Sequence, residues 1–108
     1  MDKLDNLTEA FRQFNEERDW DQFHTPENLA KSISIEAAEL LECFQWNDTD
    51  FDREHVKEEL ADVIVYCQNM LDELGLDVDE IINDKMDKNE AKYPVEKAKG
   101  SAAKYDQL

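Results

Sequence analysis

Apolar residues recur every three or four positions along most of the chain, a spacing that favours amphipathic α-helices over strands. The first such stretch runs from about Leu4 to Arg18. Its apolar face consists of Leu4, Leu7, Phe11 and Phe14. A second stretch begins after Thr25, a good N-cap, has Pro26 at its first helical position and reaches about Phe44. The pattern therefore predicts two helices joined by a polar and aromatic link at residues 19–24.

A polar break at residues 47–52 precedes a third helical stretch, expected over residues 53–74. Gly75 follows it, at the position where a left-handed residue commonly ends a helix. A fourth helix is expected over residues 77–92, with an Asp at its start and a Pro shortly after its end. No segment alternates as a strand would. The sequence thus predicts one all-α domain over residues 1–108, with an architecture like a four-helix bundle.

The third stretch carries more apolar surface than one buried face needs. Residues 60–67 read Leu-Ala-Asp-Val-Ile-Val-Tyr-Cys, which is apolar nearly all round the helix. Such a helix is buried on more than one side, and a chain of 108 residues has little left to cover the second side. The pattern therefore predicts a homo-oligomer, in which a partner copy supplies the missing cover.

The chain is strongly acidic, with 28 Asp and Glu residues against 12 Lys and Arg residues and a formal net charge of −16. Such a surface excludes nucleic acid as a partner, because its binding rests on neutralising phosphates with basic side chains. Only residues 85–108 are locally basic, with six Lys against four Asp and Glu. An anionic ligand would need a metal ion or this segment to offset the charge.

Two further features concern the compartment. Cys43 and Cys67 both fall inside apolar helical patterns, which is typical of buried thiols in a reducing environment rather than of a disulfide scaffold. The N-terminus has no apolar signal segment, and no stretch approaches the roughly 18 apolar residues of a membrane span. We therefore expect a cytoplasmic protein with no membrane partner.

Two pairs of carboxylates stand out against the apolar stripes. Glu36 and Glu39 are three residues apart in the second stretch, and Glu59 and Asp62 have the same spacing in the third, so each pair shares a helical face. No Lys or Arg lies near either pair on its own helix. If the two helices are antiparallel neighbours, four carboxylates converge and require neutralisation. An all-oxygen ligand set favours Mg²⁺ or Mn²⁺ over zinc.

Three ordered motifs at these positions resemble a known family. Residues 35–46 read Ile-Glu-Ala-Ala-Glu-Leu-Leu-Glu-Cys-Phe-Gln-Trp, residues 58–63 read Glu-Glu-Leu-Ala-Asp-Val, and residues 89–94 read Asn-Glu-Ala-Lys-Tyr-Pro. Together they resemble the MazG-like all-α nucleotide pyrophosphohydrolases, and most closely the short subgroup that includes dCTP pyrophosphatases. The resemblance covers about residues 15–105, most of the chain.

The resemblance implies an enzyme of nucleotide-pool house-cleaning that cleaves a nucleoside or deoxynucleoside triphosphate to the monophosphate and pyrophosphate. The substrate would be either dCTP-like or non-canonical, and the metal would be Mg²⁺, for which Mn²⁺ can substitute. The resemblance also implies that Glu36, Glu39, Glu59 and Asp62 bind the metal. Among them, Glu39 is the candidate acceptor of the proton from the attacking water. The substrate-binding positions it implies are Trp20, His24, Trp46, Tyr66, Asn89, Lys92 and Tyr93. The last three would reach the substrate across a subunit boundary, within a homodimer or, as the subgroup favours, a homotetramer.

Two alternatives compete with this interpretation. One is a sister enzyme with the same chemistry but dUTP or phosphoribosyl-ATP as substrate. The other is an acidic helical-bundle interaction protein without catalysis. The second requires its carboxylates on the outer surface, whereas Asp62 lies among apolar residues of the third stretch.

Overall fold

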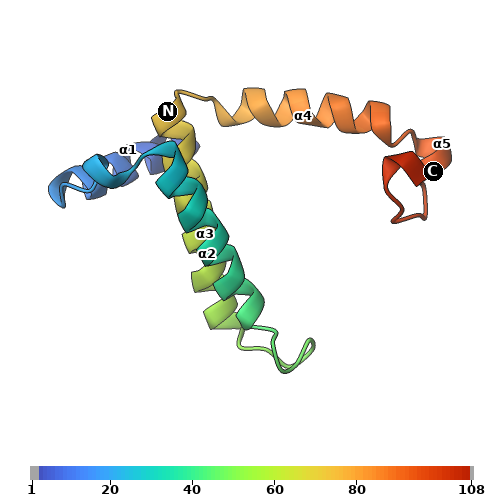
Figure 1. The fold of residues 1–108 in the computed structure, drawn as a ribbon, viewed down its shortest axis with the longest axis horizontal. Coiled ribbons are helices and arrows are strands. Elements are labelled where there is room, and N and C mark those ends of the chain that lie inside the picture. The colour runs from blue at the N-terminus through green and yellow to red at the C-terminus, as the bar shows by residue number, and fades with distance from the viewer. Residues whose placement is uncertain (1–2, 108) are drawn as a thin grey trace. The chain divides into compact units, whose positions relative to one another are not determined.

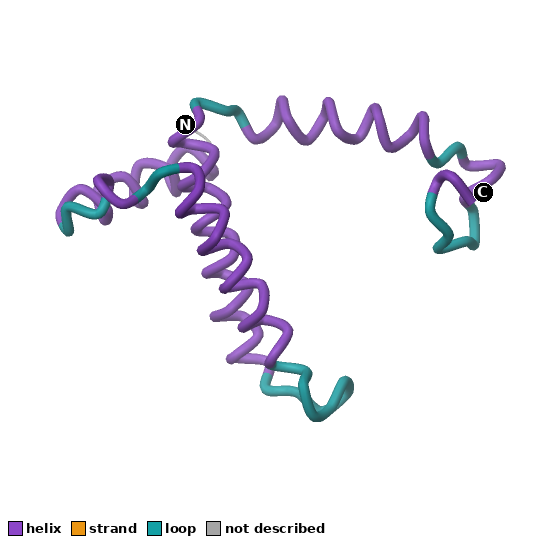
Figure 2. Tube along the Cα trace, in the orientation of Figure 1, coloured by secondary structure: helices purple, strands orange, loops and turns teal. Residues whose placement is uncertain are grey.

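Helices account for all the regular structure in the computed structural model, which describes residues 3–107 without the side chains of Leu4 and Asp5 (Figures 1 and 2). The elements are α1 (Lys3–Glu17), the short 3₁₀ turn η1 (Asp21–Phe23), α2 (Pro26–Glu42), α3 (Arg53–Leu74), α4 (Val78–Lys92), α5 (Val95–Ala98) and η2 (Tyr105–Gln107). The all-α prediction is therefore confirmed. The chain divides into two compact units, Met1–Gly75 and Leu76–Leu108.

The helix boundaries follow local capping chemistry. Thr25 caps α2 by accepting a hydrogen bond from the backbone N–H of Asn28, and Asp52 caps α3 through the N–H groups of residues 54 and 55. Gly75 ends α3 in the left-handed region with φ 66°, as expected. The predicted end of α2 at Phe44 was wrong by two residues. After Glu42 the backbone tightens, and residues 43–45 donate to carbonyls three positions back.

The end of α1 determines where the aromatic link goes. Asp19 adopts φ 54°, a left-handed conformation that Asp tolerates better than most residues. The N–H of Asp19 then donates to the carbonyl of Glu16, and the N–H of Trp20 donates to the carbonyl of Asn15. This pair of bonds closes the helix and turns Trp20 back onto Phe14, where the two rings meet edge to face with centroids 5.5 Å apart.

The first unit is built on a hairpin in which α2 and α3 run antiparallel along each other, with α1 packed against α3 (Figure 1). Arg12 of α1 forms a bidentate ion pair with Asp72 of α3, and the amides of Asn15 and Asn69 meet between the same two helices. Leu29 of α2 is fully enclosed, with 1% of its surface exposed. The side chain of Leu4, predicted to lie on the apolar face of the first helix, is outside the described residues.

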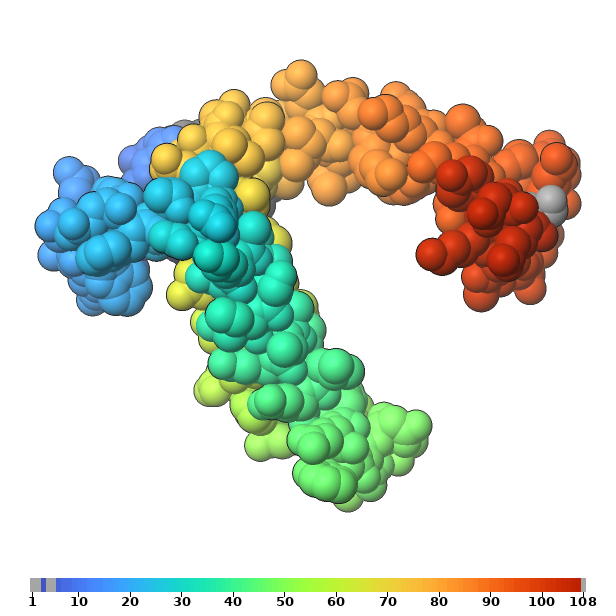
Figure 3. Space-filling model, viewed as in Figure 1, coloured from blue at the N-terminus to red at the C-terminus, as the bar shows by residue number. Residues whose placement is uncertain are grey.

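Much of the hairpin's apolar surface is uncovered. Leu60 and Ile64 of α3 are 46% and 53% exposed, and Ile35 and Leu41 of α2 are exposed as well. On the face seen in Figure 3, no other segment of this unit covers the distal part of the hairpin. This matches the expectation that one chain cannot bury both sides of residues 60–67. No helix among the described residues is long and apolar enough to cross a membrane.

The second unit contains α4, α5 and η2. Asp77 caps α4 through the N–H of Glu80, as the sequence predicts, and α4 ends at Lys92 before Pro94. The small polar tail folds back locally: the ring of Tyr105 lies edge to face with that of Tyr93, at 6.3 Å between centroids. The Lys92 ammonium lies 4.9 Å from the Tyr105 ring centroid, a cation–π contact. The last residue of the tail, Leu108, lies outside the described residues.

Candidate functional site

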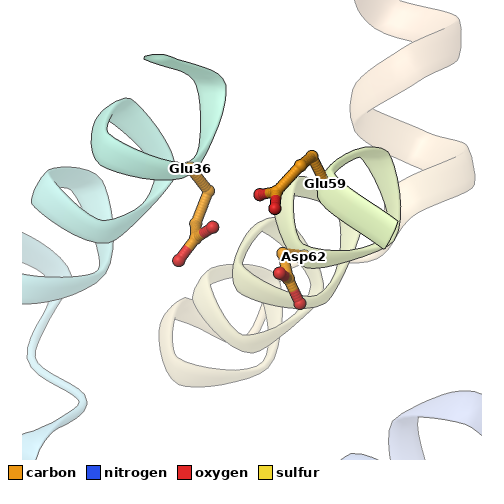
Figure 4. A group of neighbouring side chains, drawn as sticks. All are labelled: Glu36, Glu59 and Asp62. Atoms are coloured by element: carbon orange, nitrogen blue, oxygen red, sulfur yellow. The ribbon is translucent and has the colours of Figure 1, made fainter. Parts of the chain in front are cut away.

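Three of the four predicted metal ligands converge between α2 and α3. Glu36 points from α2 toward Glu59 and Asp62 of α3, as Figure 4 shows, and one carboxylate oxygen from each lies within 4.8 Å of the others. The convergence follows from the antiparallel hairpin, because the i, i+3 spacing keeps Glu59 and Asp62 on the face of α3 that meets α2. Two motifs more than twenty residues apart in sequence thus form one cluster.

The cluster is electrostatically unsatisfied. Oε2 of Glu36 and Oε2 of Glu59 are fully enclosed and have no hydrogen-bond partner. Burial is the largest cause that raises the pKa of the Glu36 carboxyl, followed by the adjacent Glu39. The pKa of the Glu59 carboxyl is raised by the same two causes and lowered in part by His55. Within the described residues, no Lys or Arg pairs with any of the four carboxylates.

The two other carboxylates have different environments from the expected ones. Asp62 was expected to be buried among apolar residues, but in the single chain it is exposed. Glu39 is exposed as well and falls outside the closest group of three. It still lies near enough to raise the pKa of the Glu36 and Glu59 carboxyls, first through a side-chain hydrogen bond and then through its charge. Its place is therefore at the margin of the cluster.

His55 is a member of the site that sequence reasoning missed. Its Nε2 lies 3.2 Å from Oε1 of Glu59, one helical turn away on α3. This contact involves the oxygen of Glu59 that is not enclosed, and it leaves Oε2 facing the other carboxylates. The i, i+4 spacing of His55 and Glu59 is the sequence signal that points to the contact.

The donor set fits a hard divalent cation. Buried carboxylate oxygens without partners are costly, and a cation placed among them would remove both the desolvation cost and the mutual repulsion. All the converging ligand atoms are oxygens, which suits Mg²⁺, Mn²⁺ or Ca²⁺ and not a site built from thiolate and imidazole. The cluster can therefore hold a divalent metal.

Two adjoining pockets open beside the cluster, with volumes of about 430 and 290 Å³. Both are lined by Trp20, His24 and Tyr66, three of the predicted substrate-binding residues. The larger pocket extends along α2 to Lys31 and Ser32. In the smaller pocket the lining includes Asp62, so the carboxylate cluster and this pocket share a residue. The structure thus brings the N-terminal aromatic link, α1 and α3 together next to the candidate metal centre.

Tyr66 lies where the pocket meets the cluster. Burial raises the pKa of its phenol, and the nearby charges of Glu36, Asp62 and Glu39 raise it further. The phenol therefore stays protonated at neutral pH and can donate a hydrogen bond from its O–H.

The other predicted substrate-binding residues lie elsewhere. Trp46 is 90% exposed in the turn between α2 and α3 and lines neither pocket. Asn89 and Lys92 are in α4 and Tyr93 directly follows it, all within the second unit. In that unit Lys92 and Tyr93 contact Tyr105. Their role at the site stays a prediction.

The chain is similar to known proteins in both sequence and fold. Residues 31–108 match the model of the MazG-like family. The chain belongs to the MazG-like family. It is 37% identical to dCTP pyrophosphatase 1 of Mus musculus and 33% identical to that of Homo sapiens, over 97% of this chain and 67% of each relative. A crystal structure of a pyrophosphatase from Archaeoglobus fulgidus is 42% identical, with a TM-score of 0.78, covering 87% of this chain and 94% of the other.

Proposed function

We propose that this protein binds Mg²⁺ through Glu36, Glu39, Glu59 and Asp62 and hydrolyses a deoxynucleoside triphosphate to the monophosphate and pyrophosphate. As a MazG-like family member with such relatives, it is a nucleoside triphosphate pyrophosphohydrolase, and the finer proposal concerns the metal and the substrate. The first substrate to consider is dCTP, because the mammalian relatives are dCTP pyrophosphatases. This membership favours an enzyme over the acidic interaction protein considered from sequence.

The observation that carries the proposal is the pair of enclosed, partnerless oxygens on Glu36 and Glu59. They face a third carboxylate, no Lys or Arg of the described residues pairs with them, and His55 contacts only the other oxygen of Glu59. Burying such oxygens without a partner destabilises the fold, and a cation bound between them would remove that cost. A bound Mg²⁺ would offset the roughly −4 charge of a triphosphate and polarise the phosphorus under attack.

The protein's own groups have separate tasks in this proposal. Glu39 lies exposed at the margin of the cluster, where its carboxylate can accept a proton from the attacking water. Tyr66 donates its phenol O–H to a phosphate or sugar oxygen beside the cluster. Trp20 and His24 line the space that receives the nucleoside.

We further propose that the working protein is a homodimer or homotetramer. The uncovered Leu60 and Ile64 on the hairpin support association, because exposed apolar side chains on an otherwise packed helix gain from burial. Trp46, Asn89, Lys92 and Tyr93 would then reach the substrate of a neighbouring copy. The cytoplasm, expected from the two cysteines, stays a prediction; both thiols are free in this structure.

The proposal is tested by incubating the pure protein with each common NTP and dNTP, including dUTP, in Mg²⁺ and separating the products by ion exchange. The expected products are monophosphate and pyrophosphate, with dCTP the fastest substrate. A preference for dUTP would assign the sister activity instead. Absence of cleavage with both Mg²⁺ and Mn²⁺ would contradict the proposal.

Two adjacent glutamates provide a matched pair of variants. Glu59→Gln removes a ligand from the cluster and should lower kcat by roughly 100-fold or more, as loss of a metal ligand usually does. Glu58→Gln makes the same chemical change one residue earlier, at an exposed position outside the cluster. It should leave turnover and Mg²⁺ dependence near the wild-type values.

A further inference from the structure

The smaller pocket contains a polar feature that the proposed hydrolysis does not use. Asn15 of α1 and Asn69 of α3 both line it, and they are 7% and 9% exposed. Nδ2 of Asn15 donates to Oδ1 of Asn69 at 3.2 Å. Both residues project from helix faces that otherwise pack apolar and aromatic side chains, such as Phe11 and Val65. A buried pair of amides in such a wall needs an explanation.

The pair leaves hydrogen-bonding capacity unused. Oδ1 of Asn15 and Nδ2 of Asn69 form no hydrogen bond with any described residue. Among the described residues, side-chain atoms that are both fully enclosed and without a partner occur in Glu36 and Glu59 alone. The two unpaired amide atoms are therefore not fully enclosed but open to solvent, and both residues line the pocket.

The pair always leaves one donor and one acceptor free, and turning both amides over exchanges their places. As drawn, Asn15 offers an acceptor and Asn69 a donor. If both amides flip, Asn69 donates the hydrogen bond between the two residues and Asn15 accepts it. The free groups are then a donor on Asn15 and an acceptor on Asn69. One donor beside one acceptor is thus a property of the pair itself.

The position of the pair relative to the metal centre indicates the ligand. Asp62 contributes to the same pocket, so a triphosphate bound at the carboxylates has this pocket within reach of its nucleoside. The pocket wall supplies aromatic surface from Phe14 and Trp20, which suits a flat ring. Every nucleobase carries a donor next to an acceptor on its pairing edge, and enzymes recognise that edge by hydrogen bonds combined with stacking.

We propose that the Asn15–Asn69 amide pair hydrogen-bonds the pairing edge of the substrate's nucleobase, and that the orientation in which the two amides are held sets the base selectivity of the enzyme. The proposal rests on the proposed function, since it takes the carboxylate cluster as the triphosphate end of the site. A cytosine offers its amino group to the acceptor of the pair and its ring nitrogen to the donor. A uracil edge requires the flipped arrangement.

The test uses the double variant Asn15→Leu/Asn69→Leu, which replaces both amides by side chains of similar size and leaves neither one unpaired. The values to compare are kcat/KM for dCTP, dUTP, dTTP, dATP and dGTP. The expected result is that the ratio between the best and the worst base collapses by about 10- to 100-fold, since recognised polar groups give discrimination of that order. Asn83→Leu, an exposed position in α4, is the matched control and should keep the ratios.

A binding assay tests this inference independently of the proposed hydrolysis. Calorimetric titration with the five deoxynucleoside monophosphates needs no turnover, so a base preference seen in the wild type and lost in the double variant would support the pair's role even if no triphosphate were cleaved. An equal loss for every base, or ratios unchanged in both assays, would mean that the amides only hold α1 to α3, and would overturn the inference.

If the double variant failed to fold, the single variant Asn69→Asp would replace it. Its carboxylate accepts the bond from Asn15 but has no donor, so base preference should change while melting remains cooperative.

Discussion

At the scale of single residues, the site is defined by two oxygens that lack a partner. Glu36 and Glu59 have carboxyl pKa values raised above the ordinary 4.5, mainly by burial. In the metal-free protein the folded state therefore holds these protons more tightly than the unfolded chain does. Their contribution to stability is fully present below about pH 4.5 and is lost as the pH rises through the folded-state pKa. A metal ion would reverse that loss at neutral pH.

This predicts a stability effect that does not depend on turnover. At pH 7, Mg²⁺ should raise the melting temperature of the wild type more than it does at pH 5, where the carboxylates are partly protonated. Glu36→Gln should raise the melting temperature of the metal-free protein at pH 7 by a few degrees and remove most of the response to Mg²⁺. Glu42→Gln, exposed on the same helix, is the control. Differential scanning fluorimetry measures both, and an equal Mg²⁺ response in the two variants would contradict the assignment.

At the scale of elements, α3 depends on its N-cap. Asp52 accepts hydrogen bonds from the N–H groups of Glu54 and His55, at 3.0 and 3.3 Å, and so fixes the turn that leads into the metal-binding face. Asp52→Ala should cost about 1 kcal/mol, which corresponds to a drop of roughly 4–8 °C in melting temperature for a domain of this size. Asp48→Ala removes the same charge from the preceding turn and should have little effect. Equal losses in the two variants would mean that charge, and not capping, is responsible.

The elements themselves were largely predictable from sequence because their signals are local. Thr25, Gly75 and Asp77 each act on a backbone within three residues, and the sequence predicts all three as helix ends. The cap at Asp52 is equally local, but the sequence pattern indicated only a polar break there. The contact between His55 and Glu59 was also local but was overlooked. The pairing of Asn15 with Asn69 was not predictable in the same way, since it depends on how α1 packs across α3. The exposure of Asp62 likewise depends on how α1 and α2 pack beside it, which the local pattern of α3 does not give.

At the scale of the whole molecule, the uncovered hairpin predicts association. The wild type should elute as a dimer or larger by size-exclusion chromatography with light scattering. Ile64→Glu puts a charge into the exposed apolar face and should shift the protein to a smaller species, because an unpaired charge in an interface is costly. Ala10→Glu adds the same charge at an exposed position of α1 and should not. A monomeric wild type would contradict the oligomer proposed here.

The two tryptophans differ in a way that gives the protein two distinct natural fluorophores. Trp20 is 42% exposed, leans on Phe14 and forms part of both pocket walls, whereas Trp46 is 90% exposed in the turn between α2 and α3. A small quencher such as acrylamide therefore reaches their emissions to different extents. Acrylamide quenching can be measured at each step of a nucleotide titration. Protection of the Trp20 emission would then show that nucleotide covers the pocket, and protection of the Trp46 emission that it covers the turn.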